Sequence, residues 1–230
     1  MCAYAIKPLV VGPLATNCWI YPLSGPSGEL PPGQGRPCAV IDPGAQANVI
    51  ISRMEELNLF PRYILLTHGH FDHLAALPAL AARVAAGGVP AEIAIHRDDL
   101  SCLGPGAYQV HRESFIAAAG NAAYVDERWE PLPPAGRLLS DGDVLGPFRV
   151  LHLPGHTPGS AGFYDEKAGV LFTGDTLFVE GVGRTDLPGG DSRALAASLR
   201  RIFTLPGDTV FFPGHGPFGG VLEAERDLFL

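Results

Sequence analysis

Short apolar runs that stop abruptly at small or polar residues recur along the whole chain, and they set its predicted architecture. Their Val, Ile, Leu and Phe content is typical of buried strands, which we predict at residues 4–11, 17–22, 38–41, 63–66, 92–95, 149–153, 162–165, 170–173 and 209–212. Apolar residues at helical spacing predict helices at residues 47–57, 74–86, 108–119, 192–203 and 222–228. This alternation of strands and helices in two halves predicts an α/β protein built from two sheets covered by helices.

The way the strands end is itself a pattern. Four of them stop at a small residue or a turn, and a side chain that can bind a metal follows: His68, His156, Asp175 and His215. Asp42 follows residues 38–41 in a similar way. Glycines at these positions let the chain leave a strand sharply. We therefore expect these side chains to meet at one edge of the sheets.

The densest polar cluster is the segment His68-Gly69-His70-Phe71-Asp72-His73. The strand at 63–66 should deliver it to a strand end, and Asp72 should lie near the N-terminus of the helix at 74–86. Gly69 is expected to bend the backbone so that His68 and His70 point into one space. Imidazole and carboxylate groups together are what zinc, iron and manganese bind. The segment therefore predicts a metal site.

Composition limits the class of protein further. The 230 residues, 47% apolar and 17% charged, suit one globular domain, and the net charge of -8 gives no basic footprint for nucleic acid or an anionic membrane. No stretch has the length of a membrane span. Four scattered cysteines form no disulfide framework, so we expect reduced thiols in a cytoplasmic protein. The Gly- and Pro-rich residues 24–37 should form an exposed loop, and residues 97–136 should cover one side of the site.

In these motifs the chain resembles the metallo-β-lactamase superfamily, whose HxHxDH motif corresponds to residues 68–73. The resemblance covers nearly the whole chain and implies a four-layer αβ/βα sandwich with a binuclear site at the sheet edge. It also implies two divalent metal ions, with zinc expected and iron or manganese as alternatives. The residues that the resemblance assigns are His68, His70 and His156 for the first ion, Asp72, His73 and His215 for the second, and Asp175 as a bridge. Asp72 and Asp175 would thereby also act in catalysis.

Within the superfamily, residues 154–160 and 183–191 are similar to the hydroxyacylglutathione hydrolases, also called glyoxalase II. This likeness implies a thioesterase that uses a metal-bridging hydroxide on a small-molecule thioester, with a glutathione thioester as the first candidate. The full-length enzymes carry a C-terminal helical domain that binds glutathione. We expect residues 1–230 to form a single domain without that separate unit.

Three other functions are compatible with the same fold. A persulfide dioxygenase shares the HxHxDH motif and a segment similar to residues 183–186, but uses one iron on two histidines and one aspartate. A nuclease of the superfamily is disfavoured by the acidic charge, and a relative that only binds a ligand is disfavoured because no metal-binding position is lost. Oxygen uptake with glutathione persulfide would distinguish the dioxygenase from the thioesterase.

Several polar residues have simpler interpretations. Asp42 is expected to accept a hydrogen bond near the site or to cap the turn at Pro43, and Arg184 to pair with Asp186 or Asp191 or to meet a substrate carboxylate. The chain has no GxSxG motif and no P-loop, so a nucleophilic side chain has little support. Turn or supporting roles are expected for Thr67 and Thr157, and surface or packing positions for His96, His111 and His152.

Overall fold

The computed structural model describes residues 6–23, 35–86, 88 and 90–229. Most of the loop predicted at 24–37, the first two residues of the strand predicted at 4–11, and Cys2 lie outside the described residues.

The first half of the chain forms a sheet of six strands, in the order β1-β2-β3-β4-β5-β6. The first three strands pair in antiparallel fashion, and β3 to β6 are parallel to one another. Parallel strands need helical crossovers, which the chain supplies. The strands are β1 (Lys7–Val11), β2 (Thr16–Pro22), β3 (Arg36–Ile41), β4 (Leu59–Leu65), β5 (Glu92–His96) and β6 (Arg137–Leu139). The helical elements are α1 (Ala47–Glu56), η1 (Phe71–His73), α2 (Leu77–Ala86), η2 (Arg97–Cys102), α3 (Ala107–Ala119) and α4 (Ala123–Arg128).

The second half forms another sheet of six strands, in the order β14-β13-β10-β9-β8-β7. Only β10 and β13 are parallel neighbours; the other pairs are antiparallel. Its strands are β7 (Val144–Leu145), β8 (Phe148–His152), β9 (Ala161–Asp165), β10 (Val170–Gly174), β13 (Val210–Pro213) and β14 (Gly220–Val221). A small hairpin of β11 (Leu177–Phe178) and β12 (Gly181–Val182) stands apart, and α5 (Ser192–Ile202) and α6 (Leu222–Phe229) complete the half.

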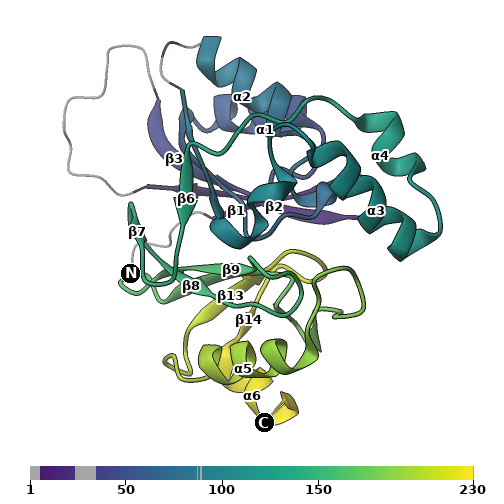
Figure 1. The fold of residues 1–230 in the computed structure, drawn as a ribbon. Helices are drawn as coiled ribbons and strands as arrows, with labels where there is room; N and C mark the ends of the chain where they lie inside the picture. Colours follow the sequence, from purple (N-terminus) through teal and green to yellow (C-terminus); the bar gives the residue numbers. More distant parts are fainter. Residues whose placement is uncertain (1–5, 24–34, 87, 89, 230) are drawn as a thin grey trace.

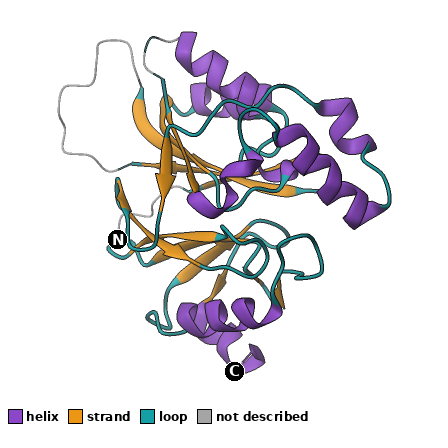
Figure 2. Ribbon diagram, in the orientation of Figure 1, coloured by secondary structure: helices purple, strands orange, loops and turns teal. Residues whose placement is uncertain are grey.

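Three hydrophobic clusters separate four layers. One cluster packs the helices of the first half on their sheet through residues such as Ile50 and Leu80. The second joins the inner faces of the two sheets through large rings, among them Trp19 and Phe172. The third packs α5 and α6 on the second sheet. Helices therefore lie outside and strands inside, as Figures 1 and 2 show, and the predicted αβ/βα sandwich is confirmed.

The two sheets are joined where the site lies. The amide of Asn17, on β2, donates to the carbonyl of Gly214 after β13 (2.7 Å), and the amide of Ala161 donates to the carbonyl of Thr67 (2.7 Å). The pairing directions bring the carboxyl ends of β3, β4, β5, β8, β10 and β13 to this same edge. Residues that follow these strands therefore face one another across the junction.

The predicted helix at 74–86 is wrong at its start. The motif continues into the short 3-10 helix η1, and α2 begins only at Leu77. Pro78 explains the shift, because proline has no amide hydrogen and is tolerated only in the first turn of a helix. Asp72 therefore lies in a separate turn and not at the N-terminus of α2.

Several observed elements were not predicted, among them η2 and the short strands β6, β7 and β14. Helix α4 follows α3 within residues 97–136, and the β11–β12 hairpin precedes residues 183–191. Among the described residues, no helix is both long and apolar enough to cross a membrane.

Candidate metal centre

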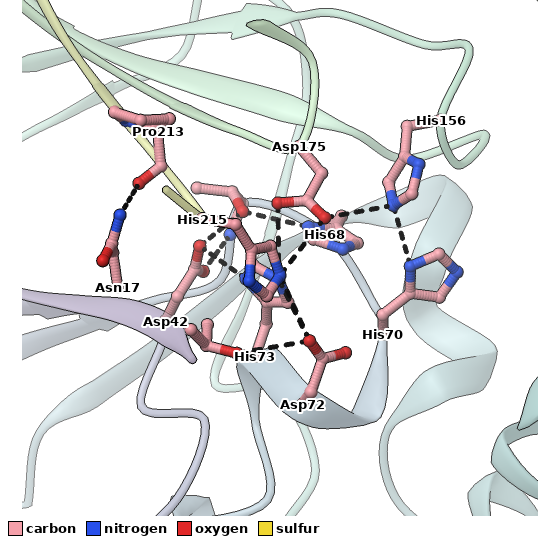
Figure 3. Close-up of polar contacts among 12 residues, drawn as sticks. Asn17, Asp42, His68, His70, Asp72, His73, His156, Asp175, Pro213 and His215 are labelled. Atoms are coloured by element: carbon pink, nitrogen blue, oxygen red, sulfur yellow. Dashed lines mark hydrogen bonds and ion pairs between the residues drawn. The ribbon is translucent and has the colours of Figure 1, made fainter. Parts of the chain in front are cut away.

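The structure brings all seven predicted ligands together at the junction of the two sheets (Figure 3). The loop after β4 carries the first two histidines, and η1 carries the next aspartate and histidine. Loops after β8, β10 and β13 carry the other three from the opposite sheet. The complete set is His68, His70, Asp72, His73, His156, Asp175 and His215.

His68, His70 and His156 form one group whose ligand atoms lie within 4.8 Å of one another. The Nε2 atom of His156 is 2.9 Å from Nδ1 of His70, and the three ring centroids are 4.6 to 4.9 Å apart. Nε2 of His68 is buried and has no hydrogen-bond partner. A buried polar atom without a partner is costly unless something else binds it.

Asp72, His73 and His215 form a second group of the same size. The two histidine Nε2 atoms are 3.1 Å apart, and Oδ2 of Asp72 is 3.6 Å from the first of them and 3.3 Å from the second. Two imidazoles and a carboxylate converging in this way offer three ligand atoms to one ion.

Asp175 reaches both groups. Its Oδ1 atom is 3.4 Å from Nε2 of His73, and its Oδ2 atom is 3.6 Å from Nε2 of His156 and 3.5 Å from Nε2 of His215. The carboxylate thus lies between the first group and the second, where a group shared by two cations would have to be.

Contacts on the far side of the rings fix their orientation. Nδ1 of His156 lies 2.8 Å from the carbonyl of Arg184, and Nδ1 of His215 lies 3.1 Å from the carbonyl of Leu14. A carbonyl only accepts, so each Nδ1 carries the proton and each Nε2 keeps its lone pair for the site. Nδ1 of His73 is likewise 3.0 Å from Oδ2 of Asp42.

The donor set therefore fits divalent metal ions. One buried nitrogen has no partner, pairs of ring nitrogens face each other at hydrogen-bond distance, and two carboxylates lie among them. Imidazole with carboxylate suits zinc, iron and manganese.

The histidines of the two groups differ in the direction of their pKa shifts. Burial, with neighbouring histidines, lowers the pKa of His68 well below its usual value and that of His70 to about 3. Burial also opposes charge on His73, but the carboxylates of Asp175, Asp72 and Asp42 outweigh it and raise its pKa well above the usual value. His68 and His70 are therefore neutral at pH 7, whereas His73 is protonated in the metal-free protein.

This difference predicts how proton release accompanies metal binding. At pH 7 His68 and His70 have no proton to lose, but His73 is protonated because of its raised pKa and must release one when a metal binds. Calorimetry in buffers of different ionisation enthalpy should therefore show more proton release with the second group than with the first, and second-site affinity should rise with pH. Equal proton release at both steps would contradict this assignment.

The supporting residues predicted near the site take those roles. Asp42 accepts hydrogen bonds from the amide and hydroxyl of Thr67 (2.8 and 2.7 Å) and contacts His73, which confirms the predicted hydrogen bond near the site. Its φ of 53° is unusual for a residue other than glycine, and strain of this kind persists where surrounding contacts hold it.

The other predicted packing and pairing contacts are confirmed as well. His111 is buried against Phe71, with its Nε2 2.9 Å from the carbonyl of Cys102. His96 and His152 stack at 3.9 Å with Asp98 near both. Nε2 of His152 is 2.8 Å from the carbonyl of Pro158. Because the rings of His96 and His152 are stacked, their in-plane lone pairs do not point to one metal position.

Of the two partners considered for Arg184, the structure shows Asp186, at 2.7 and 2.6 Å.

The sequence interpretation missed two supporting residues. Thr16 donates to Oδ2 of Asp72 (3.2 Å), and Asp99 accepts from the amide of Gly69 (2.8 Å). Asp99 follows β5 at the same edge, so the strand-end pattern could have indicated it. Gly69 has no positive φ; a side chain there would meet Cys102, so close approach explains this glycine better than a special bend.

Comparison with known proteins agrees with this geometry. The family model of the metallo-beta-lactamase superfamily matches residues 33–215. Hydroxyacylglutathione hydrolase GloC of Haemophilus influenzae is 37% identical, covering 82% of this chain and 84% of that protein. The probable metallo-hydrolase YqgX of Bacillus subtilis is 34% identical, covering 84% and 87%. The crystal structure of TTHA1623 in a di-iron-bound form has a TM-score of 0.77 at 37% identity, covering 96% of both chains.

The fold and the site thus define a protein of the class that binds divalent metals between two helix-covered sheets. The chain belongs to the metallo-beta-lactamase superfamily, and it is a metallo-hydrolase of that superfamily.

Proposed function

We propose that the protein is a binuclear thioester hydrolase of the hydroxyacylglutathione hydrolase type. The observation that carries the proposal is the place of Asp175, whose two oxygens reach His73 on one side and His156 on the other. Such an arrangement suits two ions that share a carboxylate. The 37% identity to hydroxyacylglutathione hydrolase GloC supports the substrate class.

The residues would bind the two ions as follows. His68, His70 and His156 would hold one ion, and Asp72, His73 and His215 the other, with Asp175 shared. Two such ions would supply a hydroxide nucleophile from water near neutral pH and would polarise a carbonyl oxygen. We propose zinc, with iron or manganese as alternatives.

The protein's own part is to orient these groups and to keep the basic nitrogens free. Asp42 holds the ring of His73, and the carbonyls of Leu14 and Arg184 hold two other rings. Asp72 and Asp175 are the carboxyls among the predicted ligands; burial opposes their charge, but their histidine neighbours lower both pKa values, that of Asp175 to about 2. Neither carboxyl can donate a proton at pH 7, which suits a thiolate leaving group because it needs little protonation.

A cavity of about 340 Å³ is lined by Gly12, Pro13, Ala45, Gln46, Ala75 and Arg128. Its lining residue Pro13 precedes Leu14, whose carbonyl lies 3.1 Å from Nδ1 of His215. We propose that this cavity takes part of the substrate. Arg128 is its one cationic lining residue, and we propose that it contacts an anionic group of the thioester.

Arg128→Ala should therefore raise KM for a glutathione thioester several-fold and leave kcat within about twofold, because it removes binding but no metal contact. Steady-state kinetics measures both. Arg112→Ala on α3 is the control, since that arginine pairs with Asp126 and does not line the cavity. An unchanged KM in Arg128→Ala would show that the substrate lies elsewhere.

A mononuclear iron persulfide dioxygenase is the second candidate. The observation that bears on it is that TTHA1623, at 37% identity, was crystallised in a di-iron-bound form; this supports iron as the metal, but with two ions and not one. Three ligands within one group would be sufficient for a single iron. The intact second group does not decide the question, because such residues can persist without a second metal.

Titration of the metal-free protein with zinc, while thioester hydrolysis is followed, tests the binuclear proposal. Activity should keep rising until two ions are bound per chain. Full activity at one ion would contradict a binuclear mechanism.

We also propose a cytoplasmic location, supported by the free thiols of Cys18, Cys38 and Cys102.

A further inference from the structure

The hydrogen bonds of Asp99 differ from those of the seven predicted metal ligands. It lies in η2, after β5, and is 3% exposed. Its Oδ2 atom accepts hydrogen bonds from the amide of Gly69 (2.8 Å) and the hydroxyl of Thr157 (2.7 Å), and its Oδ1 atom accepts from the amide of Gly159 (2.8 Å). Three donors around one buried carboxylate satisfy it without any cation.

These partners belong to two different loops. Gly69 stands between His68 and His70, in the loop that leaves the first sheet. Thr157 follows His156 directly, in the loop that leaves the second sheet. One carboxylate thus connects the two loops that carry the first metal group, and it does so across the junction of the sheets.

The packing around Asp99 is as close as the hydrogen bonding. A Cβ atom built on Gly159 would lie 2.6 Å from the amide nitrogen of Asp99 and 2.7 Å from its Cβ. A Cβ atom on Gly69 would lie 3.3 Å from Cβ of Asp99 and 2.7 Å from Cβ of Cys102. Both loops therefore approach this turn through a glycine, and neither position has room for a side chain.

We propose that Asp99 is a positioning residue for the first metal group: it sets the separation between the turn of His68 and His70 and the loop of His156. It touches none of the three ring nitrogens that would bind the ion, so its effect acts through the backbone of both loops. The inference rests on the proposed function only in taking this group as a metal site.

Asp99→Asn is the first test, because it keeps the shape of the side chain. An amide can accept through one oxygen only, and its NH2 group would face a backbone N–H, of either Gly69 or Gly159. We expect the first stepwise zinc affinity to fall about 10- to 100-fold, the usual scale for losing a residue that orients metal ligands. Competition with a chromophoric chelator measures this affinity without any substrate.

Asp165→Asn is the matched control. Asp165 is 4% exposed and accepts hydrogen bonds from Oη of Tyr21 (2.8 Å) and the amide of Ala168 (3.1 Å), at the opposite end of β9 from the site. It should lower the unfolding temperature of the metal-free protein and leave both zinc affinities unchanged. This separates positioning from a general loss of stability.

Thr157 variants keep the proposal testable if Asp99→Asn does not fold. Thr157→Val removes one hydrogen bond to Asp99 and should weaken the first zinc step, whereas Thr157→Ser keeps the hydroxyl and should restore it. Thr16→Val, which removes the donor to Asp72, should instead weaken the second step.

The proposal is overturned if Asp99→Asn, or Thr157→Val in its place, lowers the unfolding temperature but keeps the first zinc affinity of the natural protein. It is also overturned if both zinc steps weaken equally. Neither readout uses substrate, so a failure of the thioesterase assignment would leave the result on Asp99 intact, and the reverse also holds.

Discussion

Asp175→Ala should bind one metal ion per chain instead of two, and its thioester hydrolysis should fall by more than about 100-fold. The carboxylate contacts His73, His156 and His215, so its removal leaves both groups without their shared anion. Loss of a residue that only orients a ligand costs about 10- to 100-fold, and loss of a shared ligand should cost more. Elemental analysis of protein purified without chelator, together with hydrolysis rates, measures both effects.

Asp165→Ala is the control for this substitution, because it removes a buried aspartate at the far end of β9 and should keep both ions. Two ions and near-normal turnover in Asp175→Ala would refute the bridging role.

His73→Ala should lose the second ion, keep the first, and lower turnover by at least about 100-fold, on the same scale. Its ring faces Asp72 and Asp175 with one nitrogen and Asp42 with the other, whereas the first group does not depend on that ring for a ligand atom. Stepwise zinc titration should therefore show one remaining binding step, close to the natural first affinity.

The metal-free form of this variant should also unfold more easily. His73 is protonated there among three buried carboxylates, and breaking a buried ion pair costs about 3–5 kcal/mol. This stabilisation is complete below the usual histidine pKa and disappears as pH rises through the raised one. His111→Ala removes an equally buried histidine and should keep both ions; a normal turnover in His73→Ala would favour a mononuclear mechanism.

The sequence was sufficient to predict the fold because its signals are local. The alternation of strands and helices indicates the layers, and the strands that end at a small residue followed by a His or Asp indicate the edge at which side chains meet. His156 and His215 are far apart in the chain, yet both follow strands whose carboxyl ends reach one edge. That placement follows from strand direction alone.

Other features depend on tertiary contacts that no local pattern shows. The short turn of Asp72 replaced the expected helix start because Pro78 shifted α2. Asp99 looked like an ordinary acidic residue, and only the approach of two loops through Gly69 and Gly159 gives it a role. The region at 97–136 is weakly patterned because its aromatic contacts, such as Phe71 on Trp129, join residues distant in sequence.

The most direct test of the thioesterase proposal presents the metal-loaded protein with a 2-hydroxyacyl glutathione thioester and, in parallel, with glutathione persulfide, while thiol release and oxygen are both recorded. We predict release of free thiol from the thioester and no oxygen consumption with either compound. Oxygen uptake with the persulfide, and no cleavage of the thioester at any practical concentration, would contradict the proposal and establish the dioxygenase in its place.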